Sequence, residues 1–319
     1  MLFEKQIVNM FRTQFLIRCD DKKIANYFSA ADFPGLQQED FSFPSSCGHT
    51  LQGCFYSYDH PIPGRIIVFD HGFGGGHRSY MKEIELLCRH GFLVFAYDHT
   101  GCMCSGGENI RGFSQSLRDL DDCFKALKAT DKCKNLDFSV MGHSWGGFST
   151  LNICALHPEI SHIVVLSGFV SVKKLVEQFF SGILKVYHKT VMALDPNTDY
   201  IGYDAVDSLS GTNAKTLLIY SANDKMVSKN VHYETLKAGL AHKENVRLLL
   251  VENKGHNPNY TENAVAYLEE FSASASKMGK KKKLQTEEQK TAFRNSWDWH
   301  RMTAQDEAVW AEIFKTLDA

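Results

Sequence analysis

A serine enclosed by two glycines is the feature of this sequence that points most directly to chemistry. Ser144 lies in Gly142-His143-Ser144-Trp145-Gly146, directly after the run DFSVM, which has strand character, and directly before a helical stretch. A serine hydroxyl reacts well only when its proton is removed and its Oγ is exposed, and a tight strand–turn–helix connection exposes it on a strained backbone. The residues two before and two after the serine pack together in that turn, which requires glycine at both. We therefore predict that Ser144 is a nucleophile rather than an idle turn residue.

The elements that must position this serine alternate along the chain. Short aliphatic runs are separated by longer amphipathic stretches, a pattern typical of a mostly parallel sheet with crossover helices. The predicted strands cover residues 41–43, 50–58, 65–70, 92–97, 137–141, 161–166, 216–221 and 246–251. The predicted helices cover residues 79–90, 114–130, 146–157, 230–241 and 261–272. We expect an α/β fold in which an eight-stranded, mostly parallel sheet is flanked by helices.

The serine motif and its context resemble the α/β-hydrolase superfamily, over residues 41–271. In that family an acid and a histidine follow the serine, each on a loop after a late strand. The resemblance implies Asp224, in SANDKMV after TLLIYS, and His256, in ENKGHNPNY after VRLLLV. The aspartate would orient the imidazole, and His256 would take the Ser144 proton. Other aspartates stay open as the acid, namely Asp195, Asp199 and Asp204.

Two further loops match motifs of similar hydrolases. Residues 70–77 read DHGFGGGH, and in the family an HG-x turn supplies one backbone N–H to the oxyanion, so the resemblance implies Phe73 and Trp145 as the two donors. A phosphate-binding loop is disfavoured, because the segment contains neither G-K-[ST] nor G-x-G-x-x-G in the required register. Residues 98–105, DHTGCMCS, resemble the D-x-x-G-x-G-x-S turn of monoglyceride-lipase-like and serine-aminopeptidase-like members, except that Met103 replaces the second glycine. We expect this turn to be structural.

Four segments describe the expected domain organisation. Residues 1–40 form a helical lead-in, and residues 41–272 form the hydrolase core. Within the core, residues 168–215 lack a clear strand and read as a small helical cap. A basic linker, residues 273–283, then leads to a C-terminal helical extension, residues 284–319, which docks on the core by an apolar stripe. The lysine run in the linker could contact an anionic partner, but a solvated linker is favoured.

Composition excludes several classes of function. The 319 residues carry 35 Lys and Arg against 37 Asp and Glu, a formal net charge of −2, so nucleic acid is not an expected partner. No apolar run is long enough for a transmembrane helix, and the first residues lack the apolar core of a signal peptide. Nine cysteines without paired spacing favour a reducing compartment, and we expect the cytoplasm. A lone C-x-C pair does not predict a metal site.

The sequence therefore predicts a serine hydrolase that requires no metal or organic cofactor. The expected substrate is a small-molecule carboxylic ester of small to medium size with a mainly hydrophobic surface, which reacts through an acyl-enzyme on Ser144. A peptidase or amidase, an acyltransferase and a non-enzymatic binding protein on the same fold are the alternatives. The binding protein is the weakest, since all three positions of the expected triad are filled. The oligomeric state is not predicted.

Overall fold

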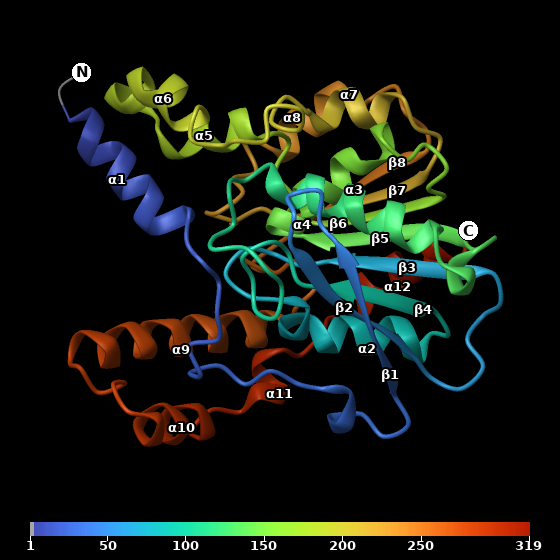
Figure 1. The fold of residues 1–319 in the computed structure, drawn as a ribbon, viewed down its shortest axis with the longest axis horizontal. Coiled ribbons are helices and arrows are strands. Elements are labelled where there is room, and N and C mark those ends of the chain that lie inside the picture. Colours follow the sequence, from blue (N-terminus) through green and yellow to red (C-terminus); the bar gives the residue numbers. More distant parts are fainter. Residues whose placement is uncertain (1–2) are drawn as a thin grey trace.

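A computed structural model describes residues 3–319 and contains one twisted eight-stranded sheet between two layers of helices (Figure 1). The strand order is β1-β2-β4-β3-β5-β6-β7-β8; β2 pairs antiparallel with β1 and with β4, and the other neighbours are parallel. The strands are β1 (Gln37–Pro44), β2 (Thr50–Ser57), β3 (Arg65–Asp70), β4 (Leu93–Tyr97), β5 (Asp137–His143), β6 (His162–Leu166), β7 (Lys215–Ser221) and β8 (Val246–Val251). The predicted fold class is confirmed; β1 begins four residues earlier than expected, and β7 begins one residue earlier.

The central strands are apolar throughout because both faces of the sheet are covered. In β3, Ile66 and Val68 face one hydrophobic core, whereas Ile67 and Phe69 face the other. This alternation follows from the two-residue period of a strand, and it explains why the buried strands read as continuous aliphatic runs rather than as alternating ones. The parallel strands all end at the same edge of the sheet, where their following loops meet.

Twelve α-helices are described. They are α1 (Glu4–Phe15), α2 (Met81–Arg89), α3 (Gln115–Lys128), α4 (Ser144–Asn152), α5 (Val172–Phe179), α6 (His188–Met192), α7 (Ala205–Ser210), α8 (Tyr233–Gly239), α9 (Glu262–Lys280), α10 (Glu287–Asn295), α11 (Trp299–Met302) and α12 (Glu307–Leu317). Helices α3, α4, α7 and α8 contribute to the core on one face, and α2 and α12 to the core on the other. The two layers hold the loops at the carboxyl edge of the sheet in fixed positions.

The segment predicted as a cap divides into two parts. Helices α5 and α6 pack against each other, and α6 also contacts α1, so the three helices form a group beyond the edge of the sheet (Figure 1). Helix α7 differs, because it packs on α4 and α8 in the helical layer. The predicted cap, residues 168–215, therefore includes α7, a helix that belongs to the layer packed on the sheet. The reason is that Leu209 and Ala205 of α7 are fully buried in the main core, which a short pattern does not reveal.

The C-terminal residues depart most from expectation. The expected basic linker, residues 273–283, is largely helical, since α9 continues to Lys280. Small residues and Met278 favour this helix, and Ala275 and Met278 pack in a cluster around Phe271 and Phe293. Helix α12, in the expected C-terminal extension, packs on β6 and β7. The extension thus completes one face of the sheet, where Ile313 and Leu317 of α12 are fully buried.

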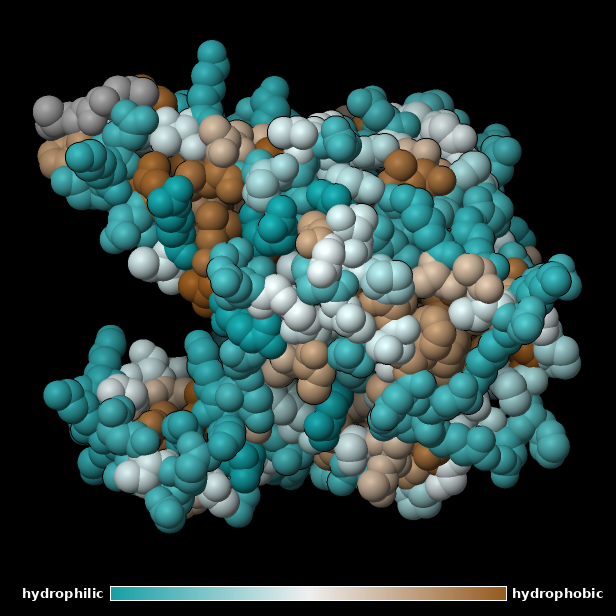
Figure 2. Space-filling model, in the orientation of Figure 1, coloured by the Kyte–Doolittle hydropathy of each residue, from teal (hydrophilic) through white to brown (hydrophobic). Residues whose placement is uncertain are grey.

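The molecular surface is hollowed between two projecting groups of helices. Figure 2 shows apolar residues gathered on the group that contains α1, α5 and α6, whereas the group that contains α9 and α10 is mostly hydrophilic. The carboxyl ends of the parallel strands point toward this hollow (Figure 1). Within residues 3–319, every helix is too short or too polar to cross a bilayer.

Candidate active site

Ser144 occupies a strained turn between β5 and α4. Its φ of 56° lies in the left-handed region, which costs a non-glycine residue about 1–3 kcal/mol unless the surroundings enforce it. The two glycines permit the turn as predicted: a Cβ on Gly142 would come 2.6 Å from the carbonyl oxygen of Gly146, and a Cβ on Gly146 would come 2.6 Å from the carbonyl oxygen of His71. Ser144 itself is half-buried. The backbone therefore presents the serine hydroxyl at the edge of the sheet.

Three polar side chains form a connected line at this edge. Ser144 Oγ lies 2.7 Å from Nε2 of His256, and Nδ1 of His256 lies 2.8 Å from Oδ2 of Asp224. The other carboxylate oxygen of Asp224 accepts the backbone N–H groups of Met226 and Val227, at 2.8 and 3.0 Å. The structure thus brings together the three residues that the sequence suggested, although they lie 80 and 112 positions from Ser144 along the chain.

The protonation of this line follows from its geometry. Burial alone would raise the pKa of Asp224, but its hydrogen bond and attraction to His256 and the two backbone N–H groups outweigh burial and lower the pKa. An ionised carboxylate only accepts hydrogen bonds, so Nδ1 of His256 carries the hydrogen and Nε2 is left to accept the Ser144 proton. The arrangement can deprotonate Ser144 and can stabilise the resulting imidazolium.

The two predicted oxyanion donors lie on adjacent elements. Phe73 follows β3 in the glycine-rich loop, and Trp145 lies in the first turn of α4, where backbone N–H groups have no helical acceptor. The rings of Phe73 and Trp145 are 6.1 Å apart in an edge-to-face contact. The side chain of Trp145 is fixed by a hydrogen bond from its indole N–H to the carbonyl oxygen of Phe113, at 2.6 Å. The side chains of Phe73 and Trp145 are therefore neighbours, and Trp145 directly follows Ser144 in the chain.

Comparison with known families agrees with this architecture. The sequence model of the serine aminopeptidase S33 family matches residues 61–248, more than half of the chain. The chain belongs to the serine aminopeptidase S33 family of α/β hydrolases. The matched region begins before β3 and ends in β8, so it includes Ser144 and Asp224 but not His256 or any residue of α9 to α12.

Relatives of this S33 family member include esterases and lipases. The chain is 29% identical to a monoacylglycerol lipase of Mycolicibacterium smegmatis over 56% of this chain and 60% of the lipase. It is 31% identical to a 2-hydroxy-6-oxo-6-(2'-aminophenyl)hexa-2,4-dienoic acid hydrolase of Metapseudomonas resinovorans, over 33% of this chain and 36% of that hydrolase. The chain thus spans less than two thirds of these curated relatives. A solved esterase of Pyrococcus furiosus has the same fold, with a TM-score of 0.60 at 17% identity, over 84% of this chain and 98% of the esterase.

The aspartate turn after β4, residues 98–105, is structural. Asp98 Oδ1 accepts the backbone N–H and Nδ1–H of His77, at 2.9 and 2.8 Å. The hydroxyl of Ser105 donates to the carbonyl of Asp98 at 2.5 Å. Met103, at the position of the missing glycine, adopts a φ of 42°. The turn therefore keeps a left-handed backbone despite the substitution, as hydrogen bonding around Asp98 enforces it.

A hydrogen-bond chain beside the triad was missed by sequence reasoning. Nε2 of His143 donates to the carbonyl oxygen of His256 at 2.7 Å, so Nδ1 of His143 must accept, and it receives the hydroxyl of Tyr80 at 2.8 Å. The Tyr80 oxygen in turn accepts the N–H of Gly72 at 3.1 Å. Burial lowers the pKa of His143 to about 3, which keeps this ring neutral. The sequence signal that could have indicated this chain is His143, the residue before Ser144 in G-H-S-W-G.

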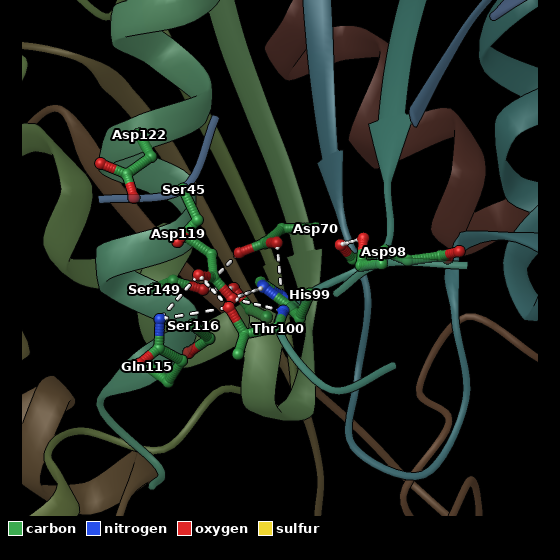
Figure 3. A network of polar contacts seen from close by, with 12 residues as sticks. Ser45, Asp70, Asp98, His99, Thr100, Gln115, Ser116, Asp119, Asp122 and Ser149 are labelled. Carbon is green, nitrogen blue, oxygen red and sulfur yellow. Dashed lines mark hydrogen bonds and ion pairs between the residues drawn. The ribbon is translucent and has the colours of Figure 1, made fainter. Parts of the chain in front are cut away.

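Beneath the turn of Ser144, a buried histidine lies between two carboxylates (Figure 3). Nε2 of His99 is 2.8 Å from Asp70, and Nδ1 is 3.3 Å from Asp119; these contacts are ion pairs rather than in-line hydrogen bonds, and all three side chains are fully buried. Burial alone would lower the pKa of His99, but the two carboxylates outweigh it and raise the pKa to about 10. Asp70 also accepts the hydroxyl of Ser149 in α4. The charged ring thus ties β3, α3 and α4 together under the candidate nucleophile.

Proposed function

We propose that this S33 family member is a serine hydrolase that cleaves carboxylic esters through an acyl-enzyme on Ser144. The observation that carries the proposal is the continuous contact from Ser144 through His256 to the buried carboxylate of Asp224. The monoacylglycerol lipase relative supports the same reaction class. No metal or organic cofactor takes part in the proposed reaction.

The proposed mechanism has two halves. His256 takes the Ser144 proton as Oγ attacks the ester carbonyl, and the backbone N–H groups of Phe73 and Trp145 hold the oxyanion. The tetrahedral intermediate then expels the alcohol, which leaves with the proton from His256. In the second half, His256 deprotonates a water molecule that attacks the acyl-enzyme, and Ser144 regains its proton as the acid is released. Each bond that forms and breaks is thereby balanced by one proton transfer.

The surroundings of Ser144 support a hydrophobic acyl group. The ring of Phe73 is 6.4 Å from Phe113 and 6.3 Å from Phe15 of α1, and Phe15 is 6.0 Å from Phe179 of α5. These side chains come from four separate elements and present apolar surface beside the candidate oxyanion residue. Ligand sites with such linings recognise apolar groups by burial, with a few polar groups for orientation. A small to medium hydrophobic ester is therefore the proposed substrate.

Peptide or amide cleavage is the second candidate, because the family is described as a serine aminopeptidase. An aminopeptidase needs carboxylates that are free to bind a substrate ammonium group. Asp195 is occupied, because it accepts both polar groups of Ser114 at 2.8 and 2.9 Å, whereas Asp204 uses one carboxylate oxygen for the N–H of Val206 at 3.0 Å. The use of Asp195 removes one carboxylate from this role, and the lipase relative favours the ester. Acyl transfer to another acceptor would follow the same first half-reaction.

A fluorophosphonate probe tests the proposal. The probe should add once to the intact protein, peptide mapping should place the adduct on Ser144, and Ser144→Ala should abolish it. Turnover of acetyl to octanoyl p-nitrophenyl esters, measured beside aminoacyl amides, then separates the two reaction classes. Amide turnover that exceeds ester turnover would replace the ester by the peptidase. A folded protein without any adduct would favour a binding protein on this fold.

The proposed partner is a small molecule, and the proposed location is the cytoplasm. All nine cysteines lie within the described residues and are free thiols, which suits a reducing compartment. Fractionation with antibody detection would test the location directly.

A further inference from the structure

The loop that carries His256, residues 252–261, joins β8 to α9 and has two sides. On its inner side it is held by the loop after β7: the N–H of Lys254 donates to Ser221 Oγ at 3.1 Å, and the N–H of Gly255 donates to Asn223 Oδ1 at 2.9 Å. Asn253 has a φ of 56°, a strained value for a non-glycine residue. Such a loop does not keep one conformation by local preference alone, so its outer side must also be held.

A strand-like pairing holds the outer side. The C-terminal segment between α11 and α12 forms an antiparallel bridge in which Gln305 faces Tyr260. Two backbone hydrogen bonds flank this bridge: the N–H of Thr261 donates to Ala304 at 2.9 Å, and the N–H of Asp306 donates to Asn259 at 2.8 Å. The histidine loop therefore lies between the β7 loop and residues 303–306.

The buried carboxyl group of Glu83 joins the histidine loop to residues 303–306. Glu83 Oε1, on α2, accepts the amide N–H groups of Asn259 at 2.9 Å and of Gln305 at 3.1 Å, and Asn259 also donates to Gln305 Oε1 at 2.8 Å. Glu83 and Asn259 are 1% and 2% exposed. Burial raises the pKa of Glu83. The three side chains form a closed triangle in which the loss of any one leaves buried polar groups unpaired.

An ion pair ties the start of the loop to the same segment. The Lys254 ammonium group is buried, donates to the carbonyl of Tyr260 at 2.7 Å and pairs with Asp306. Asp306 Oδ1 also accepts the N–H of Ala308 at 3.0 Å at the beginning of α12. Since α12 packs on β6 and β7, the pair connects the histidine loop to the rigid sheet. The contact therefore transmits the position of the C-terminal helix to the loop.

We infer that residues 303–306 and Glu83 position His256 for proton transfer from Ser144, so that the C-terminal extension is part of the active-site scaffold. This inference rests on the proposed function. The extension lies outside the region matched by the family, residues 61–248, so its contacts are a feature of this chain beyond that match. Residues 303–306 are positioning residues, because they contact the loop and its neighbours rather than the reacting atoms.

Three substitutions in the 319-residue chain test the inference. Gln305→Ala and Glu83→Ala open the triangle, and Glu83→Gln retains an oxygen that can accept both amides. The matched control is Arg301→Ala, in the same extension, whose side chain donates to Asn263 and stacks on Tyr267 but does not contact residues 252–261. The first readout, hydrogen–deuterium exchange of a peptide that covers residues 252–261, is independent of enzyme activity.

We expect both alanine variants to exchange this peptide at least about tenfold faster, while peptides from β5 and α4 stay at the wild-type rate. With an ester substrate, kcat should fall about 10- to 100-fold and KM should change less than about twofold, since a displacement of about 1 Å in a catalytic group costs on the order of 100-fold. Glu83→Gln should recover most of both losses, and Arg301→Ala should match the wild type. The Glu83→Ala and Gln305→Ala effects should not add in the double variant.

Wild-type exchange and kcat in a folded Gln305→Ala variant would overturn the inference. If this variant does not fold, Lys254→Met decides, because it removes the ion pair and leaves the triangle intact; unchanged exchange there has the same meaning. A wild-type protein without a fluorophosphonate adduct would defeat the proposed function separately, while faster exchange in the variants would still support the bracing of the loop. The two failures are therefore distinguishable.

Discussion

The ring of Phe15, at the end of α1, lies 6.3 Å from the ring of Phe73 in the glycine-rich loop. Phe15 also lies 5.5 Å from Phe113 and 6.0 Å from Phe179. A helix from the beginning of the chain thus contributes to the apolar surface beside the proposed oxyanion donor. Helix α1 lies outside the region matched by the family, residues 61–248, and we expect this contact to contribute to substrate specificity.

Phe15→Ala should change the preference for acyl length. An aromatic contact contributes about 0.5–1.5 kcal/mol, and 1.4 kcal/mol corresponds to a factor of ten, so kcat/KM for an octanoyl ester should fall about two- to tenfold. The acetyl ester, which is too short to reach the ring, should be hydrolysed at the wild-type rate. Gln14→Ala, an exposed residue of the same helix, is the control. Equal losses for both esters would contradict a role in acyl recognition.

Asp224→Asn should lower kcat by about 10³- to 10⁴-fold, because the amide cannot hold the imidazole in the required tautomer or stabilise its positive charge. The variant keeps the size of the side chain and one oxygen for the N–H groups of Met226 and Val227, so the circular dichroism spectrum should not change. Steady-state kinetics with an ester measures the loss. Asp204→Asn, which affects only the beginning of α7, should stay near wild type; the reverse pattern would reassign the acid.

The hydroxyl of Tyr80 links His143 to Gly72 by two hydrogen bonds, and Tyr80→Phe removes it. Nδ1 of His143 and the N–H of Gly72 each lose this buried hydrogen-bond partner, which should lower the free energy of unfolding by about 1–3 kcal/mol. We also expect kcat to fall, since the chain links the His256 loop to the glycine-rich loop. Urea denaturation and ester kinetics measure the two effects. The control is Tyr267→Phe, which removes a hydroxyl that accepts the exposed N–H of Asp298 and should show neither loss at comparable size.

Stability should depend on pH through His99. Its pKa in the folded protein is about 10, above the ordinary value of 6.5, so the charged ring contributes stability that is fully present below pH 6.5 and is lost as the pH rises through 10. The midpoint of urea denaturation should therefore decrease between pH 7 and pH 10.5. Asp119→Asn removes one of the two neighbouring negative charges and should move this decrease to lower pH. The same pH dependence in both proteins would show that another group is responsible.

Several parts of this protein followed from local sequence patterns. The buried strands are continuous apolar runs. The strand, the two glycines and the helix around Ser144 are adjacent in the chain, so short-range sterics are enough to predict the turn and its strained backbone. The acid and the histidine were predictable through the resemblance to the α/β-hydrolase superfamily, which implies an acid and a histidine on loops after late strands.

Only the tertiary structure decided what lies against these elements. The amphipathic pattern of α1 indicates a buried stripe but not that Phe15 contacts Phe73, since the partner surface comes from residues far along the chain. In the same way, residues 273–280 resemble a polar linker until Ala275 and Met278 have a cluster to pack against. The partner of His143 and the contacts of Gln305 depend on side chains brought together from distant segments. Local sequence determines the conformation of a segment, whereas the pairing of surfaces depends on the packing of the whole chain.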